Sequence, residues 1–432
     1  MQEEKQNITQ VKPHGFKEYL SYLGPASIIT MAIMGPGTIG SMLTSGSSLG
    51  PQVGWMVLFS ALTSWWFLAL SNKTTCLTGR APLETLYDLW TPLAMLGFLL
   101  AVIPQIFIVM VQGATAGQTF EAITGIKSSI VIWPALLIII LVFYQGKFSA
   151  FKVIAKVFVL IMCLFSIVFA VRLLLGPELS FGEAVKGLVI PKWPDHPGVM
   201  GILAGVVGGA GTWGVLAFHG YSIKQAGNAT PDKLWVSQYD AFVIGGVVFL
   251  LFSLGIFWAA SGVFYGGEVI PKTAPQAAEL FVPVLGQWAH LLFYAGFVGA
   301  IFGTMSGTNI LFSTFVFGVL EAYKYKGKDW SPRFENKKFR VFTIISLLVL
   351  CGFGAIQGRP AILPALVWSL GVATVFTPPG LALWIYLTNS EKFVGQHKNR
   401  WYWNVGLVLM FLLFTFIAIK AAPGLMRNPF RF

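Results

Sequence analysis

Apolar residues in this 432-residue chain occur in long blocks that are separated by short polar segments. Eleven such blocks can be drawn, with centres near Ile33, Leu62, Ile106, Ile138, Leu164, Gly209, Leu251, Gly303, Leu347, Val372 and Phe411. A block of about 20 apolar residues is long enough to cross the hydrocarbon core of a bilayer as a helix. The strands of a membrane barrel would instead alternate polar with apolar residues. The pattern therefore predicts an all-α polytopic membrane protein with about 11 transmembrane helices.

Composition agrees with this interpretation and excludes an ordinary soluble enzyme. Only 11% of the residues are charged and 56% are hydrophobic, whereas about 25% charged residues is typical of a soluble domain. The net charge of +12 would suit a nucleic-acid binder, but the basic residues lie in short loops and not along one face. We therefore expect the lipid bilayer as partner and no nucleic acid.

The basic residues also predict the orientation in the membrane. With eleven spans the two termini lie on opposite sides, and 20 of the 29 Lys and Arg residues then fall on the side of the N-terminus. Cytoplasmic loops of membrane proteins carry the excess of Lys and Arg. We expect a cytoplasmic N-terminus, an external C-terminus and a bacterial plasma membrane as the location.

Two of the blocks are interrupted by residues that disfavour a continuous helix. The first contains Gly35-Pro36-Gly37-Thr38, where the proline removes a backbone hydrogen bond and the glycines lower the cost of leaving the helix. The sixth contains five glycines around Thr212 and Trp213, namely Gly205, Gly208, Gly209, Gly211 and Gly214. We expect Gly35, Gly37 and Gly209 to lie in non-helical backbone. The alternative is that the glycines only let helices pack closely.

Interrupted helices five spans apart are typical of transporters built from inverted repeats, in which paired discontinuous helices surround a binding site at the membrane midplane. The sequence therefore predicts a 5+5 repeat with broken first and sixth helices, followed by an eleventh helix. The expected boundaries are 1–18 for a cytoplasmic tail, 19–176 for the first repeat, 177–197 for an external loop, 198–387 for the second repeat, and 388–432 for the last helix and tail.

Short motifs along nearly the whole chain resemble those of the NRAMP metal-ion transporters. They are Gly-Pro-Gly-Thr at 35–38, Thr-Gly-Arg at 78–80 followed by Glu84, Gln-Ala-Ala-Glu-Leu at 276–280, Ser-Gly-Thr at 306–308 and Thr-Asn at 388–389. The resemblance implies a LeuT-type fold of the APC superfamily and secondary active transport, by symport and alternating access, of a divalent metal ion.

The positions that the resemblance would assign to the metal depart from the family pattern. The family's first break reads Asp-Pro-Gly-Asn, and here Gly35 and Thr38 replace the aspartate and the asparagine. The family's sixth-span methionine falls on Thr212 or Trp213, and acidic positions of span three fall on Val109 and Gln112. The resemblance therefore identifies a divergent member without the usual charged and soft ligands, and without the usual proton route. The candidate substrate- or ion-binding residues are Gly35, Pro36, Gly37, Thr38, Gln112, Thr212 and Trp213.

The residues at the two breaks are compatible with two kinds of substrate. Carbonyl, hydroxyl and amide oxygens could hold a hydrated divalent cation such as Mg²⁺, which keeps several of its waters. Half-helix N-termini could instead bind the carboxylate of a small organic acid or zwitterion. A channel would be a third class, but it needs a continuous polar pore.

Three further residues are candidates for ion coupling by Na⁺ or H⁺. Thr304 and Thr308 lie four residues apart on one face of span eight and could complete a sodium site, or they could hydrogen-bond to their own helix. His219 lies in a broken span and could gate or carry a proton, or it could be a neutral histidine hydrogen-bonded at a helix end.

The remaining polar residues suggest no catalytic chemistry. Glu84, four residues after Arg80, is expected in a solvated cytoplasmic cluster. No phosphate loop, nucleophile triad or metal-ligand spacing occurs in the sequence. We therefore expect neither an enzyme nor a cofactor.

Overall fold

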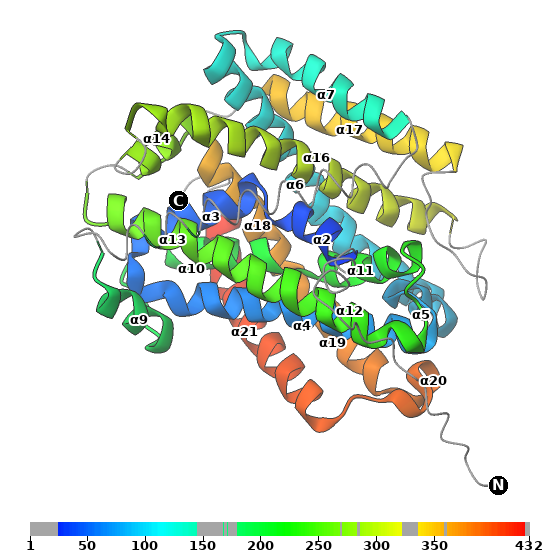
Figure 1. Cartoon of the computed structure of the whole chain (residues 1–432). Helices are drawn as coiled ribbons and strands as arrows, with labels where there is room; N and C mark the ends of the chain where they lie inside the picture. Colours follow the sequence, from blue (N-terminus) through cyan, green and yellow to red (C-terminus); the bar gives the residue numbers. More distant parts are fainter. Residues whose placement is uncertain are drawn as a thin grey trace, which may run out of the picture.

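The computed structural model describes residues 25–144, 179–267, 270–282, 286–321, 336–357 and 361–427, together with Ile167 and Val171. Every regular element within these ranges is helical (Figure 1). The first half of the chain forms α2 (Pro25–Ile33), α3 (Pro36–Leu49), η1 (Pro51–Val53), α4 (Gly54–Thr78), α5 (Pro82–Leu89), α6 (Thr91–Thr124), α7 (Ser128–Tyr144) and α9 (Phe181–Val189).

The second half begins with α10 (Val199–Ala210), α11 (Trp213–Gln225), η2 (Pro231–Lys233), α12 (Leu234–Asp240), the π-helical η3 (Ala241–Val248) and α13 (Phe249–Phe264). It continues with α14 (Ala274–Ala278), η4 (Glu279–Phe281), η5 (Gly286–Trp288), α16 (Ala289–Glu321) and α17 (Lys337–Gln357). The last elements are α18 (Ile362–Val375), α19 (Thr377–Asn389), α20 (Glu391–Val394), η7 (Gly395–His397) and α21 (Trp401–Arg427).

Ten of the eleven predicted spans correspond to described helices. Eight helical segments of the described chain are long and apolar enough to cross a membrane. The first predicted span is divided into α2 and α3, and the fourth is the shorter apolar helix α7. The fifth, centred near Leu164, lies outside the described residues. The helical, polytopic architecture is thus confirmed.

Spans one and six are both broken, as predicted. Met34 and Gly35 separate α2 from α3, and Gly211 and Thr212 separate α10 from α11. Gly35 has extended backbone, with φ −113° and ψ −169°.

The expected extent of the two breaks was wrong at two glycines. Gly37 lies in the first turn of α3, because Pro36 occupies the first helical position, where its fixed φ starts a helix. Gly209 lies in the last turn of α10. The glycine before it packs closely on another helix, since a Cβ added to Gly208 would lie 2.1 Å from the backbone oxygen of Leu370. For this glycine the close-packing alternative is correct.

Helix α3 lies at the centre of the bundle, where it contacts α10, α13 and α18. Every residue of α3 except Ser48 is buried. Small residues allow the close contacts, since a Cβ on Gly46 would lie 2.4 Å from the backbone oxygen of Phe257. Figure 1 shows α9 and α14 at one end of the bundle and α5 and α20 at the other. We call these the α9 end and the α5 end.

Span ten contains an interruption that the sequence analysis did not predict. Phe376 separates α18 from α19, and Pro378 follows within the first turn of α19. Proline is tolerated in the first turn of a helix but disrupts a helix interior. The interruption places Thr377 beside the break in span six.

Candidate functional site

The two broken helices meet at the side chain of Thr38. Its hydroxyl Oγ1 contacts the carbonyl oxygen of Ile33, at the end of α2, and lies 3.2 Å from the carbonyl oxygen of Gly209 in α10. Thr38 is buried, with 1% of its surface exposed. We call Ile33 O, Thr38 Oγ1 and Gly209 O the oxygen cluster. One hydroxyl hydrogen cannot fully satisfy two carbonyl acceptors, so the cluster retains acceptor capacity.

The oxygen cluster carries negative potential without an ionised side chain. Ile33 and Gly209 lie in the last turns of α2 and α10, and the C-terminus of a helix carries a partial negative charge. Within the described ranges, no group of three or more His, Cys, Asp or Glu residues lies close enough together to hold a metal ion. The donor set at the junction of the breaks therefore consists of neutral oxygens, which suit a hard cation.

Gly35 lies directly against Thr304 of α16. A Cβ added to Gly35 would be 1.8 Å from Thr304 Oγ1, so no side chain fits there unless Thr304 changes. Helix α16 also lies close to α2 at Gly307, where an added Cβ would lie 2.9 Å from the Cβ of Ala32. The close approach of Thr304 therefore requires glycine at position 35.

The two threonines of span eight differ in their surroundings. Thr304 lies at the first break, as a sodium site would require. The hydroxyl of Thr308, however, donates to the carbonyl oxygen of Thr304 at 2.7 Å, within its own helix. Gln105 of α6, which the sequence analysis missed, donates from Nε2 to the carbonyl oxygen of Thr308 at 3.0 Å. A sodium site at this position stays a prediction.

The break in span six is held by span ten. Thr377 Oγ1 accepts the backbone N–H of Trp213 at 3.3 Å and donates to the carbonyl oxygen of Ala373 at 2.8 Å. Thr212 precedes Trp213 in extended backbone and is partly exposed. The signal for Thr377 in the sequence was the Thr-Pro-Pro run within the tenth apolar block.

Trp213 anchors the start of α11 in the surrounding helices. Its indole Nε1 donates to the carbonyl oxygen of Gly97 in α6 at 2.7 Å, and 1% of its surface is exposed. Its ring faces Gly380 of α19, where an added Cβ would lie 2.4 Å away. These contacts bury the ring in protein on both sides. Its direct role in binding stays a prediction.

Gln112 is buried in α6, and its Oε1 has no hydrogen-bond partner among the described residues. A buried amide oxygen without a hydrogen-bond partner can coordinate a cation or accept a hydrogen bond from a water bound to the cation. The role of Gln112 in the site also stays a prediction.

His219 is a buried, hydrogen-bonded residue of α11. Its Nε2 lies 2.9 Å from Asn72 Oδ1 of α4. The Nδ2 of the same asparagine donates to the carbonyl oxygen of Ser237 at 2.6 Å, which fixes the orientation of the amide. Because Asn72 Oδ1 can only accept, we assign the ring proton to Nε2 of His219. The hydrogen bond agrees with the alternative of a hydrogen-bonded histidine, but His219 lies in the middle of α11 and not at a helix end. A gating or proton role stays a prediction.

Glu84 was wrongly expected to be solvated. It is 4% exposed, and Lys224 Nζ of α11 lies 2.8 Å from its carboxylate. Its Oε2 also accepts the backbone N–H of Ala81 at 2.7 Å. The partner is 140 residues away in the sequence, so no local pattern could reveal the pair.

A second buried carboxylate, Asp240, was also missed. Its Oδ2 accepts the backbone N–H of Ala26 at 2.7 Å and thus caps the start of α2. The two carboxylates attach α5 to α11 and α2 to α12, respectively, at the α5 end.

Comparisons with known proteins agree with this geometry. The chain matches the family model described as Natural resistance-associated macrophage protein-like over residues 26–422. It is 26% identical to a divalent metal cation transporter MntH of Vibrio campbellii, across 92% of this chain and 91% of the relative.

Solved structures show the same fold. The manganese transporter of Eremococcus coleocola superposes with a TM-score of 0.73 at 17% identity, covering 98% of this chain and 90% of that one. The nucleobase-cation-symport-1 family transporter Mhp1 gives a TM-score of 0.55 at 14% identity, covering 95% of this chain and 94% of that one. These matches confirm the LeuT-type architecture. The family match over residues 26–422 shows that the chain belongs to the NRAMP family.

Proposed function

We propose that the chain is a secondary active transporter that carries a divalent cation by alternating access, using a binding site made only of oxygen ligands. The oxygen cluster is the observation that supports this proposal. It joins the two broken helices, which is where transporters of this architecture bind their substrate. The printed name of the Vibrio relative, a divalent metal cation transporter, supports the same class of substrate.

The ligand types favour a hard cation. Carbonyl, hydroxyl and water oxygens suit Mg²⁺, whereas thioether and imidazole ligands favour softer ions. The candidate residues Gly35, Thr38, Thr212 and Trp213 offer no carboxylate, thioether or imidazole, and the thioether of Met34 in the first break is not part of the oxygen cluster. A cation that keeps part of its hydration shell needs less compensating charge from the protein. We therefore propose that the site selects Mg²⁺ over Mn²⁺.

Uptake into proteoliposomes tests the proposal. Thr38→Val removes the hydroxyl of the oxygen cluster and keeps the size of the side chain, so we expect Mg²⁺ uptake to fall at least tenfold. Thr44→Val is the matched control, because Thr44 is a buried threonine of the same helix that lies outside the cluster. The proposal fails if Mn²⁺ is preferred over Mg²⁺, or if Thr38→Val transports as well as Thr44→Val.

A small organic carboxylate or zwitterion is the second candidate, and one observation favours it. The N-terminus of α3 has no side-chain cap, so its first N–H groups are suited to an anionic group. Thermal-shift measurements with amino acids and short carboxylic acids, set beside Mg²⁺ and Mn²⁺, separate the two candidates, because a specific ligand raises the melting temperature.

The orientation and the coupling ion are part of the proposal. We propose that the N-terminus and the α5 end, where α2 begins, face the cytoplasm of a bacterial cell and that the α9 end is external, with the predicted repeat boundaries unchanged. Single cysteines at Lys398 and Lys192, in a background without the native cysteines, should react from opposite sides of the membrane; labelling from one side contradicts this. Uptake driven by an imposed Na⁺ or H⁺ gradient identifies the coupling ion.

A further inference from the structure

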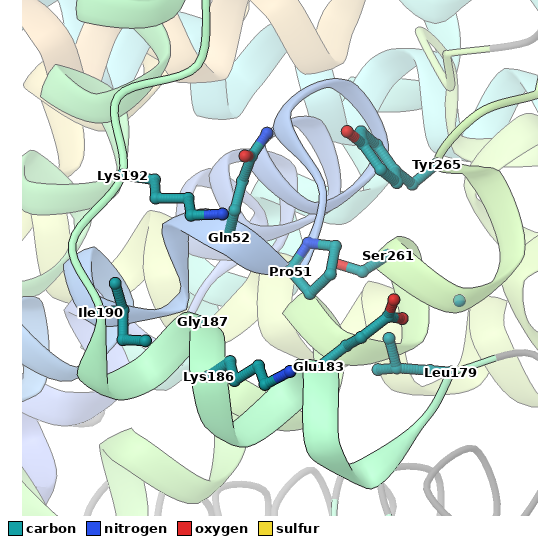
Figure 2. Close-up of a pocket in the computed structure, with 11 residues that line it drawn as sticks. Pro51, Gln52, Leu179, Glu183, Lys186, Gly187, Ile190, Lys192, Ser261 and Tyr265 are labelled. Atoms are coloured by element: carbon teal, nitrogen blue, oxygen red, sulfur yellow. The ribbon is translucent and has the colours of Figure 1, made fainter.

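A separate cavity of about 430 Å³ lies at the α9 end of the bundle. It is formed by α9, by the segment 51–52 of η1 and by the end of α13, as Figure 2 shows. Its polar lining residues are Gln52, Glu183, Lys186, Lys192, Ser261 and Tyr265. Its volume is in the range of small-molecule binding pockets.

The cavity is distinct from the oxygen cluster. Thr38 lies in the first turn of α3, and the cavity begins just beyond the last residue of that helix, Leu49. With a rise of about 1.5 Å per residue, most of the length of α3 separates the two sites. None of the residues of the cluster lines the cavity.

Close backbone packing gives the cavity a fixed frame. A Cβ added to Gly187 would lie 1.8 Å from the backbone oxygen of Pro51, so α9 rests directly on η1. The indole Nε1 of Trp55 donates to the carbonyl oxygen of Lys192 at 3.3 Å and holds the chain after α9 against α4. The ring of Tyr265 covers Gly50, where an added Cβ would lie 2.5 Å from it. A pocket held in this way needs little ordering to bind a ligand.

The charges of the lining favour an anion. Two ammonium groups, of Lys186 and Lys192, oppose the single carboxylate of Glu183. Figure 2 shows Lys192 extending toward Gln52 and Lys186 toward Glu183. The amide of Gln52 and the hydroxyl of Tyr265 add neutral donors. Two separate cationic groups, with neutral donors in the same lining, match a ligand that carries two acidic groups.

We propose that this cavity binds a small dicarboxylate, with one carboxylate at Lys192 and Gln52 and the other at Lys186. Glu183 weakens the second contact, because it competes for Lys186 and repels the ligand. A bound dicarboxylate would join α9 and the segment after it to η1, at the end of span one. It would therefore stabilise the observed packing of this end of the bundle and slow transport without occupying the oxygen cluster.

Titration calorimetry of the full-length protein in detergent, with succinate as the probe at low ionic strength, tests the proposal. We expect the double variant Lys186→Gln with Lys192→Gln to weaken succinate binding at least tenfold. Glu183→Gln should tighten it about threefold or more. Lys127→Gln is the matched control, because Lys127 is an exposed lysine of the α6–α7 connection outside the cavity, and it should leave binding unchanged.

Three outcomes would overturn the proposal: no succinate binding by the unmodified protein, weaker binding in Glu183→Gln, or an equal loss in Lys127→Gln. Short-chain phosphatidylglycerol and inorganic phosphate are titrated in parallel, and binding of the lipid without succinate would assign the cavity to a headgroup and reject the dicarboxylate. Thr38→Val should bind succinate normally, so failure of the transport proposal and failure of this one remain distinguishable.

Discussion

The breaks in spans one and six are alike in position but are held in different ways. The first is bridged by Thr38, a residue of the broken helix itself, whose hydroxyl contacts both breaks. The second is held from outside by Thr377 of α19 and is anchored in α6 by Trp213. The comparison indicates that the first break has a polar contact that a substrate can replace, whereas the second is fixed by its neighbours.

Removing the anchor of the second break should have the largest effect. Trp213→Ala deletes a fully buried ring and its hydrogen bond to Gly97, so we expect a loss of about 3–5 kcal/mol in stability. Thermal unfolding in detergent measures this loss. Trp401→Ala is the control, because Trp401 is 76% exposed. Equal shifts in the two variants would show that Trp213 is not an anchor.

Placing a carboxylate at the first break should require a second change. Gly35→Asp alone should lower stability and bind little Mn²⁺, because its Cβ would overlap Thr304. Gly35→Asp with Thr304→Gly creates the space, and we expect it to bind Mn²⁺ at least tenfold more tightly than the unmodified protein, since a carboxylate offsets the dehydration of the ion. Calorimetric titration with Mn²⁺ compares both variants. Tight Mn²⁺ binding by the unmodified protein would contradict the argument.

Removing the hydroxyl of Thr377 at the second break should lower stability moderately and leave transport unchanged. Thr377→Val loses the hydroxyl that accepts the N–H of Trp213, and we expect a loss of about 1 kcal/mol. Mg²⁺ uptake and the preference for Mg²⁺ over Mn²⁺ should stay unchanged, whereas Thr38→Val is expected to lower Mg²⁺ uptake at least tenfold. A changed ion preference in Thr377→Val would mean that both breaks bind the ion directly.

The smallest effect is expected at Thr308. Its hydroxyl bonds to its own helix, so Thr308→Val should leave the sodium dependence of uptake unchanged, and Thr308→Ser serves as the control that retains the hydroxyl. A loss of sodium stimulation in the valine variant alone would place a sodium ligand there.

Local signals in the sequence predicted the spans and the existence of both breaks. Blocks of apolar residues and a proline between glycines act over a few positions, so their effect can be seen in the chain itself. The exact limits of the breaks depend on packing between helices, as at Gly208 against Leu370. That information is not local, and the prediction erred by two residues at Gly209. At Gly37 the error has a local cause, because Pro36 already starts α3.

Most of the site depends on contacts between residues that are far apart in the sequence. The pairs Glu84 with Lys224 and Ala26 with Asp240 join positions 140 and 214 residues apart. The contact of Thr38 with Gly209 spans 171 residues. Sequence could identify Thr38 as a candidate from its place in the first break, but only the fold shows which carbonyl oxygens it meets.

The attachment of α2 has a kinetic consequence. This nine-residue helix is tied at its start by the carboxylate of Asp240 and at its end by the hydroxyl of Thr38 on Ile33. Under the proposed function, a cation that coordinated the carbonyl oxygen of Ile33 would compete with the hydroxyl of Thr38 for that oxygen. The rate at which the end of α2 separates from α3 would then depend on whether the ion is bound, while the contact with Asp240 would hold the start of the helix.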